Sequence, residues 1–134
     1  MEEGRGSTIE LAVLGAQIFD RDIHLEIYLP TKDSNGHVLL DHALWVDRAE
    51  ILFCMLFGGA TRESDAEGLW LNPETRVIIR ERTARVYSFT SAERFAVAGA
   101  EIREFLHKFG KLTGQGEVAF SINSNLIGIT RFDS

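Results

Sequence analysis

Three side chains capable of acid–base chemistry occupy alternate positions in one short stretch of the chain. His24, Glu26 and Tyr28 alternate with the apolar residues of the stretch 23–30, which is the period of a half-buried strand. On such a strand they share one face, with about 7 Å between successive Cα atoms. A histidine and a glutamate so placed can act as base and orienting partner, or as two acid–base groups, with the tyrosine hydroxyl as a donor. The alternative is an ordinary polar strand face, or one at an interface.

A second group of candidate ligand-binding residues lies on either side of a predicted turn at 72–75. Trp70 and Glu81 would lie near one another on paired strands if this turn is tight, and a tryptophan beside a carboxylate can line a ligand pocket. Arg80 and Arg82 flank Glu81 and could bind a phosphate or a carboxylate. The alternatives are structural: the tryptophan fills an edge of the core, and the arginines pair with the acidic residues that are in excess in the first half of the chain.

The chain contains no recognised metal or cofactor motif. His37, Asp41 and His42 are of metal-ligand types and close in sequence, but their spacing matches no zinc motif. The chain also has no glycine-rich phosphate loop and no nucleophile elbow. We therefore expect no metal site and no cofactor. The sequence leaves open whether the protein is an enzyme.

Length and composition predict one globular domain without disulfides. The chain has 134 residues, one of them cysteine, and hydrophobic residues make up 45% of it. Its net charge of −6 argues against a nucleic-acid-binding protein, which normally carries a basic surface. No apolar run approaches the roughly 20 residues of a membrane span, and the acidic start Met-Glu-Glu is unlike a signal peptide. We expect a cytoplasmic protein with no nucleic-acid and no membrane partner.

Apolar periodicity and turn residues predict the secondary structure. One helix begins at about Asp41 and ends before Gly58-Gly59, and a second begins with a capping box formed by Thr90 and Glu93. Strands are predicted at 23–30, 68–71, 76–89, 117–122 and 126–129. The order β-α-β-β-α-β is that of an α+β, ferredoxin-like antiparallel sheet with two helices on one face, here with an extra C-terminal strand.

The N-terminal residues are expected to lie outside this domain. Residues 1–22 are predicted to form an extension that is partly flexible, and residues 23–134 a single ferredoxin-like domain. Within the extension, residues 9–19 are apolar and fit a short helix or an edge strand equally well.

The sheet face away from the helices is expected to be covered by a partner. In the predicted strand 76–89 neither the odd nor the even positions are uniformly apolar. Either a bulge near 81–83 exchanges the two faces, or the sheet is apolar on both sides and is buried against another chain. The first helix also has a wider apolar stripe than one sheet covers. These patterns predict a homo-oligomer, either a dimer or a trimer.

Three short motifs carry a resemblance to known proteins. They are Leu-Phe-Gly-Gly-Ala-Thr at 56–61, Gly68-x-Trp70 followed by Arg80-Glu81, and Gly114-Gln115-x-x-Val118. Together they resemble a family of small uncharacterised bacterial proteins, a domain of unknown function with a ferredoxin-like α+β fold. The hairpin before a capped helix is also similar in outline to trimeric divalent-cation-tolerance and nitrogen-regulatory signalling proteins. Their longer nucleotide loop and basic phosphate motifs are not evident in this sequence. The resemblance implies the topology and no established activity.

Three functions follow as expectations. The first is a non-catalytic oligomeric binding or assembly module, because the apolar patterning is two-sided and the catalytic residues are few. The second is a small-molecule sensor, for a nucleotide or another metabolite, with its pocket between subunits at Trp70, Glu81 and the nearby arginines. The third is a small cofactor-independent enzyme that uses His24, Glu26 and Tyr28 on the open sheet face.

Overall fold

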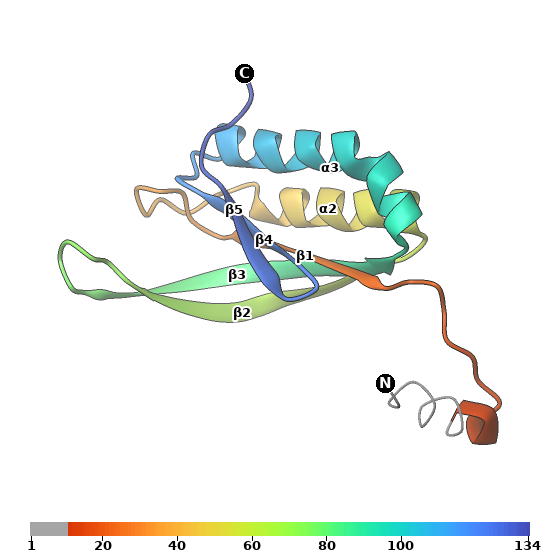
Figure 1. The fold of residues 1–134 in the computed structure, drawn as a ribbon. Helices are drawn as coiled ribbons and strands as arrows, with labels where there is room; N and C mark the ends of the chain where they lie inside the picture. The colour runs from red at the N-terminus through yellow and green to blue at the C-terminus, as the bar shows by residue number, and fades with distance from the viewer. Residues whose placement is uncertain (1–10) are drawn as a thin grey trace.

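A five-stranded antiparallel sheet with two helices on one face forms the body of the protein (Figure 1). The computed structural model describes residues 11–134, apart from the side chain of Trp70. The elements are β1 (Ile23–Pro30), α2 (His42–Phe57), β2 (Thr61–Leu71), β3 (Ile78–Thr90), α3 (Ala92–Leu112), β4 (Val118–Ile122) and β5 (Asn125–Ile129). The predicted α+β class and the antiparallel sheet are confirmed.

The central strand of the sheet is β1. The strands lie in the order β2-β3-β1-β4-β5, and every neighbouring pair is antiparallel. Residues Leu25, Ile27 and Leu29 of β1 are fully buried on the helix side, against the phenylalanines of α2 and α3. Because successive side chains of a strand point to opposite faces, the polar residues of β1 point away from the helices.

The two helix starts differ in how well the sequence predicted them. Helix α2 begins directly after Asp41 and ends at Gly58, whose φ of 89° is the left-handed conformation that glycine adopts at low cost. The predicted capping box at Thr90 is wrong by one residue. Ser91 is the N-cap of α3, and its side chain accepts a hydrogen bond from the backbone N–H of Arg94. Thr90 still pairs with Ile23 as the last residue of β3.

The β2–β3 hairpin is longer than predicted, because β2 begins at Thr61 rather than at residue 68. Its far end extends beyond the two helices (Figure 1). The bulge near 81–83, one of the two explanations offered for the mixed pattern of this strand, is wrong: the register shifts in β2, between Glu63 and Ala66, while β3 pairs with β1 without a break. Neither set of β3 positions is uniformly apolar because residues 78–83 lie largely outside the part of the sheet that the helices cover.

Residues 11–14 of the N-terminal extension form a helical turn, and residues 15–22 connect it to β1. Of the predicted segment 9–19, residues 9 and 10 lie outside the described part of the chain. No helix between residues 11 and 134 is long and apolar enough to cross a bilayer.

Candidate functional site

The open face of the sheet carries His24, Glu26 and Tyr28, the three residues proposed from the strand pattern. Nε2 of His24 lies 4.0 Å from Oε1 of Glu26. The hydroxyl of Tyr28 donates a hydrogen bond of 3.5 Å to Oγ of Ser121 on β4. The structure therefore brings the histidine and the glutamate together and turns the tyrosine towards a neighbouring strand.

Glu26 is held in an ion-pair network rather than presented to solvent. It is 7% exposed, and its carboxylate lies 3.2 Å from the guanidinium of Arg85 on β3. Arg85 also forms an ion pair with Glu63 on β2, so the three side chains link three adjacent strands. Nε of Arg85 is buried without a hydrogen-bond partner among the described residues. The role that the geometry gives Glu26 is to hold these strands in register.

His24 belongs to an aromatic cluster at one end of the sheet. Its ring centroid lies 4.7 Å from that of Phe89 and 5.3 Å from that of Tyr87. Its backbone N–H donates to the side chain of Asn123 in the β4–β5 turn. These contacts place His24 at the opposite end of β1 from the hollow described next.

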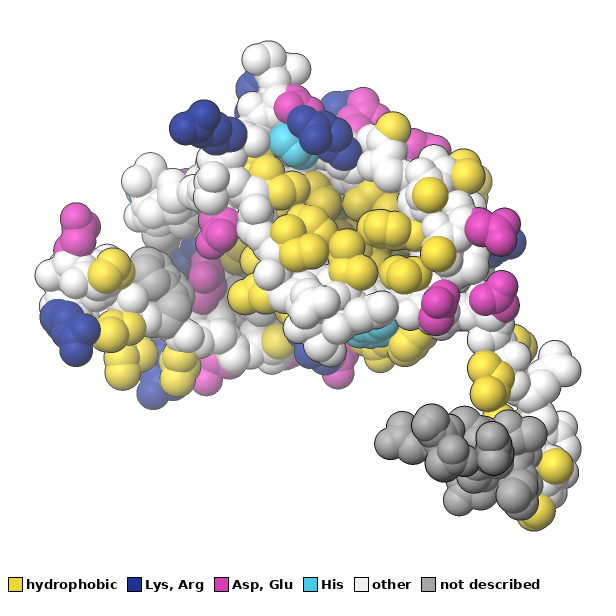
Figure 2. Space-filling view, in the orientation of Figure 1, with side chains coloured by type: hydrophobic (Ala, Val, Ile, Leu, Met, Phe, Trp, Pro, Cys, Tyr) yellow, Lys and Arg dark blue, Asp and Glu magenta, His cyan; other side chains and the backbone are white. Residues whose placement is uncertain are grey.

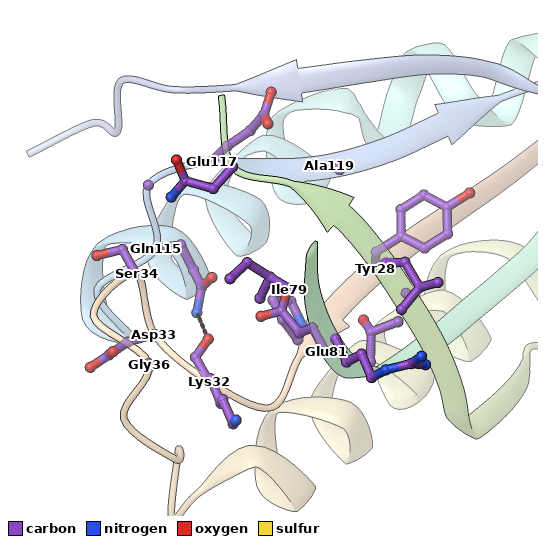
Figure 3. A pocket seen from close by; sticks show the side chains of 17 residues that line it. Tyr28, Lys32, Asp33, Ser34, Gly36, Ile79, Glu81, Gln115, Glu117 and Ala119 are labelled. Atoms are coloured by element: carbon purple, nitrogen blue, oxygen red, sulfur yellow. Dashed lines mark hydrogen bonds between the residues drawn. The ribbon is translucent and has the colours of Figure 1, made fainter. Parts of the chain in front are cut away.

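A hollow of about 770 Å³ lies on the open face where β1 ends (Figure 3). Its walls are the end of β1, the loop 31–37, the β2–β3 hairpin and the segment 115–119 that leads into β4. This volume falls within the range of small-molecule binding sites. Its polar lining includes Tyr28, Lys32, Arg80, Glu81, Gln115 and Glu117.

The loop beneath the hollow is fixed to the segment after α3. The side-chain amide of Gln115 donates to the backbone carbonyl of Lys32 over 3.0 Å, the bond drawn in Figure 3. The backbone N–H of Ser34 donates to the carbonyl of Gly114, also over 3.0 Å. Two chain segments about 80 residues apart therefore form one wall, which hydrogen bonds within the chain hold together.

The same loop is closed on itself by Asp33. Its Oδ1 accepts hydrogen bonds from the backbone N–H groups of His37 and Asn35, each of 2.9 Å. The bond from His37, with that from Asn35, lowers the pKa of the Asp33 carboxyl below its ordinary value. An ionised Asp33 is thus the form that holds the loop in shape.

Glu81 is a half-buried carboxylate at the wall of the hollow. Partial burial raises its pKa above the ordinary value, and the positive charge of Lys32 acts in the opposite direction. No salt bridge to Glu81 is present among residues 11–134. A half-buried carboxylate in this state can bind a cationic group or exchange a proton.

The two arginines beside Glu81 alternate with it along β3 and differ in their relation to the hollow. Arg80 lines the hollow and forms an ion pair of 3.5 Å with Glu67. Arg82 lies outside the hollow and pairs with Asp65 over 3.3 Å. Both arginines are therefore paired with acidic residues of β2, as the structural alternative predicted. The backbone of Trp70 pairs with Ile79, but its side chain lies outside the described part of the chain.

Lys32, Gln115 and Glu117 are among the polar residues of the hollow that were not predicted as site residues. Lys32 and Gln115 lie in loops, where no periodicity indicates which way a side chain points. Gln115 does belong to the Gly114-Gln115 motif, and its amide bond to the Lys32 carbonyl explains why an amide side chain is suited to that position.

No group of three histidine, cysteine, aspartate or glutamate side chains within residues 11–134 is placed to hold a metal ion. Nε2 of His42 lies 2.8 Å from the carbonyl oxygen of Leu29, and Nδ1 of His37 lies 3.4 Å from Oδ2 of Asp33.

Comparison with known proteins identifies similar folds. No protein-family model matches the chain. No curated protein matches it either, which agrees with the expected resemblance to a family of uncharacterised proteins. A phage SAM lyase in complex with S-methyl-5′-thioadenosine matches with a TM-score of 0.60 and 11% identity, over 86% of this chain and 94% of that one.

Two further structures are similar. The phage SAM lyase in its apo state has a TM-score of 0.57 and 11% identity, over 88% of this chain and 96% of that one. The divalent ion tolerance protein CutA1 from Ehrlichia chaffeensis has a TM-score of 0.44 and 12% identity, over 85% of each chain. At these identities the likeness to the phage enzyme is a likeness of fold.

Proposed function

We propose that this chain is a small-molecule-binding module that acts as a homo-oligomer, with its ligand in the hollow on the open sheet face. The observation that carries the proposal is Glu81, a half-buried carboxylate without a salt bridge in the described chain, at the wall of a hollow of ligand size. The loop 31–37 also supports the proposal, because hydrogen bonds within the chain hold this wall of the hollow in one shape, which lowers the entropy cost of binding.

The ligand class follows from the charge of the hollow and from the similar fold. A carboxylate that burial destabilises gains most from a ligand that brings a positive charge. The phage protein of similar fold is a SAM lyase, and one of its structures holds S-methyl-5′-thioadenosine. S-Adenosylmethionine joins a sulfonium cation to adenosine, and the ring of Tyr28 offers an aromatic surface in the same hollow. We therefore propose an adenosine-linked sulfonium or thioether as the ligand.

Two further parts of the proposal concern architecture and location. The order of helices and strands supports a ferredoxin-like arrangement to which β5 has been added. We propose that the protein works in the cytoplasm. The β2–β3 hairpin supports self-association, because four of its large apolar side chains are between 44% and 61% exposed next to the hollow: Leu69, Leu71, Val77 and Ile78.

Isothermal titration calorimetry with S-adenosylmethionine and with S-methyl-5′-thioadenosine tests the ligand. Wild-type protein should bind both. Glu81→Gln should weaken binding of the charged sulfonium by about tenfold or more, because one charge–charge contact is lost, and should change binding of the neutral thioether little. Glu74→Gln, in the exposed hairpin turn, is the matched control and should bind like wild type. Chromatography of the incubated mixtures reports whether a product forms.

Absence of binding by the wild-type protein at millimolar ligand would refute this ligand class. Equal loss of both ligands in Glu81→Gln would refute the charge argument while leaving the hollow as a site. A protein that binds neither ligand but has the mass of an oligomer would instead support the second candidate, a non-catalytic assembly module, which the exposed apolar side chains of the hairpin favour.

A further inference from the structure

An apolar groove lies on the helix side of the sheet, between α3 and the β4–β5 hairpin. It has a volume of about 550 Å³ and is separate from the hollow on the open face. Figure 2 shows hydrophobic side chains gathered in this region, bounded by the β4–β5 turn and by α3. Its lining includes Phe95, Gly99, Ile102, Phe120, Ile122 and Ile129.

A glycine of α3 lies at the wall of the groove. Gly99 lies in the interior of the helix, where glycine costs about 1 kcal/mol relative to alanine. A Cβ placed on Gly99 meets no neighbouring atom within 4 Å, so no close contact requires a glycine there. The missing side chain instead leaves room above the groove floor for a group that comes from elsewhere.

The N-terminal segment 11–19 supplies exposed side chains of the right kind. Val13 and Leu14 are 83% and 76% exposed, and Ile18 and Phe19 are each 69% exposed. The segment extends from the start of β1 away from the domain and leaves the groove uncovered (Figures 1 and 2). Four large apolar side chains on a protruding arm are unfavourable in water unless they are buried against another surface.

We propose that the arm formed by residues 11–19 of one copy binds in the α3–β4–β5 groove of a second copy. The arm leaves its own domain in a direction away from its own groove, so a second copy is the occupant that fits this geometry. If each copy inserts its arm into the other, the contact is the same on both sides and the assembly is a closed pair. This exchange concerns the helix side of the sheet and does not depend on what the hollow of the open face binds.

Light scattering during size-exclusion chromatography tests the exchange on full-length protein. Gly99→Phe fills the groove from within, and a double change of Ile18→Ser and Phe19→Ser removes the apolar end of the arm. Each should weaken the contact between arm and groove by about a hundredfold or more and lower the mass below that of the wild type at micromolar concentration. Val97→Phe, two residues away on an 86% exposed position of α3, is the control and should retain the mass of the wild type. A monomeric wild type, or an unchanged mass in both test variants, would overturn the proposal.

Disulfide trapping separates a second copy from the chain's own arm. The changes Ile18→Cys and Gly99→Cys are introduced in a Cys54→Ser background, and protein labelled with ¹⁵N is equilibrated with unlabelled protein before oxidation. Exchange between copies should give linked peptides that carry one label of each kind. Linked peptides of a single label only would show that the arm binds its own groove, and no linkage between these positions would show that the arm does not enter the groove. Either of these results overturns the proposal.

Discussion

The Arg85→Met substitution tests whether an ion-pair network organises the open face of the sheet. It removes the guanidinium that contacts Glu26 and Glu63 and keeps a long apolar stem of similar packing volume. Glu26 would then be a carboxylate with 9% side-chain exposure and no guanidinium beside it. Such a carboxylate destabilises the folded state, since its desolvation is no longer offset by an opposite charge.

The loss of stability in Arg85→Met can be estimated from how far the side chains of Glu26 and Arg85 are exposed. Removing one partner of a fully buried ion pair costs about 3–5 kcal/mol, whereas a hydrogen bond to a charged group is worth about 1.5–3 kcal/mol. Glu26 is nearly buried but the side chain of Arg85 is 37% exposed, so we expect a loss of about 2–3 kcal/mol. For a chain of this length that corresponds to a fall in melting temperature of roughly 6–12 °C.

Urea unfolding at pH 7, followed by circular dichroism, measures the loss. Glu26→Gln should cost only about 1 kcal/mol, because Arg85 keeps Glu63 as a partner. The double variant Glu26→Leu with Arg85→Met should be more stable than Arg85→Met alone, because no buried charge is then left unpaired. Arg82→Met, at an exposed ion pair three residues away, is the control and should change stability by less than about 0.5 kcal/mol. If Arg85→Met loses no more stability than this control, the network does not organise the open face.

Three further predictions concern the C-terminus and the hollow. Gly110→Ala should lower the free energy of unfolding by about 1 kcal/mol, because the added Cβ would collide with the ring of Phe132. This loss should outweigh the preference of alanine for a helix, and thermal unfolding measures the sign of the change in stability. Arg103 lowers the pKa of Asp133, so the ion pair between them should persist as pH falls through the ordinary carboxyl range and be lost only below that range. In Arg103→Gln, an NMR titration should find a higher pKa for Asp133 than in the wild type. Burial raises the pKa of Glu81, so this residue contributes to the stability of the fold at low pH and loses that contribution as pH rises through its folded pKa. Glu81→Gln should therefore have a higher melting temperature than wild type at pH 7 but not at pH 4. Equal melting temperatures of the two proteins at pH 7 would contradict the raised pKa.

The sequence predicted those elements whose pattern is imposed by the core. The stretch 23–30 alternates because one of its faces packs on helices, and it is strand β1 with its aliphatic residues buried. By contrast, residues 61–67 were not predicted as a strand. They are almost all polar, because this edge of the sheet is solvated, and no alternation can appear where no face is buried.

The candidate site was predictable only where it lies on strands. Tyr28 and Glu81 line the hollow, and both were selected from strand patterns. His24 and Glu26 were selected by the same alternation, yet their partners are an aromatic cluster and Arg85 rather than the hollow. Alternation specifies which face a side chain takes but not which end of the face holds a cavity. That depends on the loop 31–37 and its bond to Gln115, a contact between segments about 80 residues apart.

The groove on the helix side follows from the width of the sheet. Two helices cover the strands on which they pack: α2 packs on β1 and β3, and α3 packs on β4. Strand β5 adds a fifth position beyond β4, where no third helix follows in the chain that the structure describes. The helix-side residues of β5, such as Ile127, are then left partly exposed, and Gly99 prevents α3 from filling the space itself. An added edge strand without an added helix therefore leaves an apolar surface on the helix side, and the apolar arm before β1 has exposed side chains that can cover this surface in a second copy.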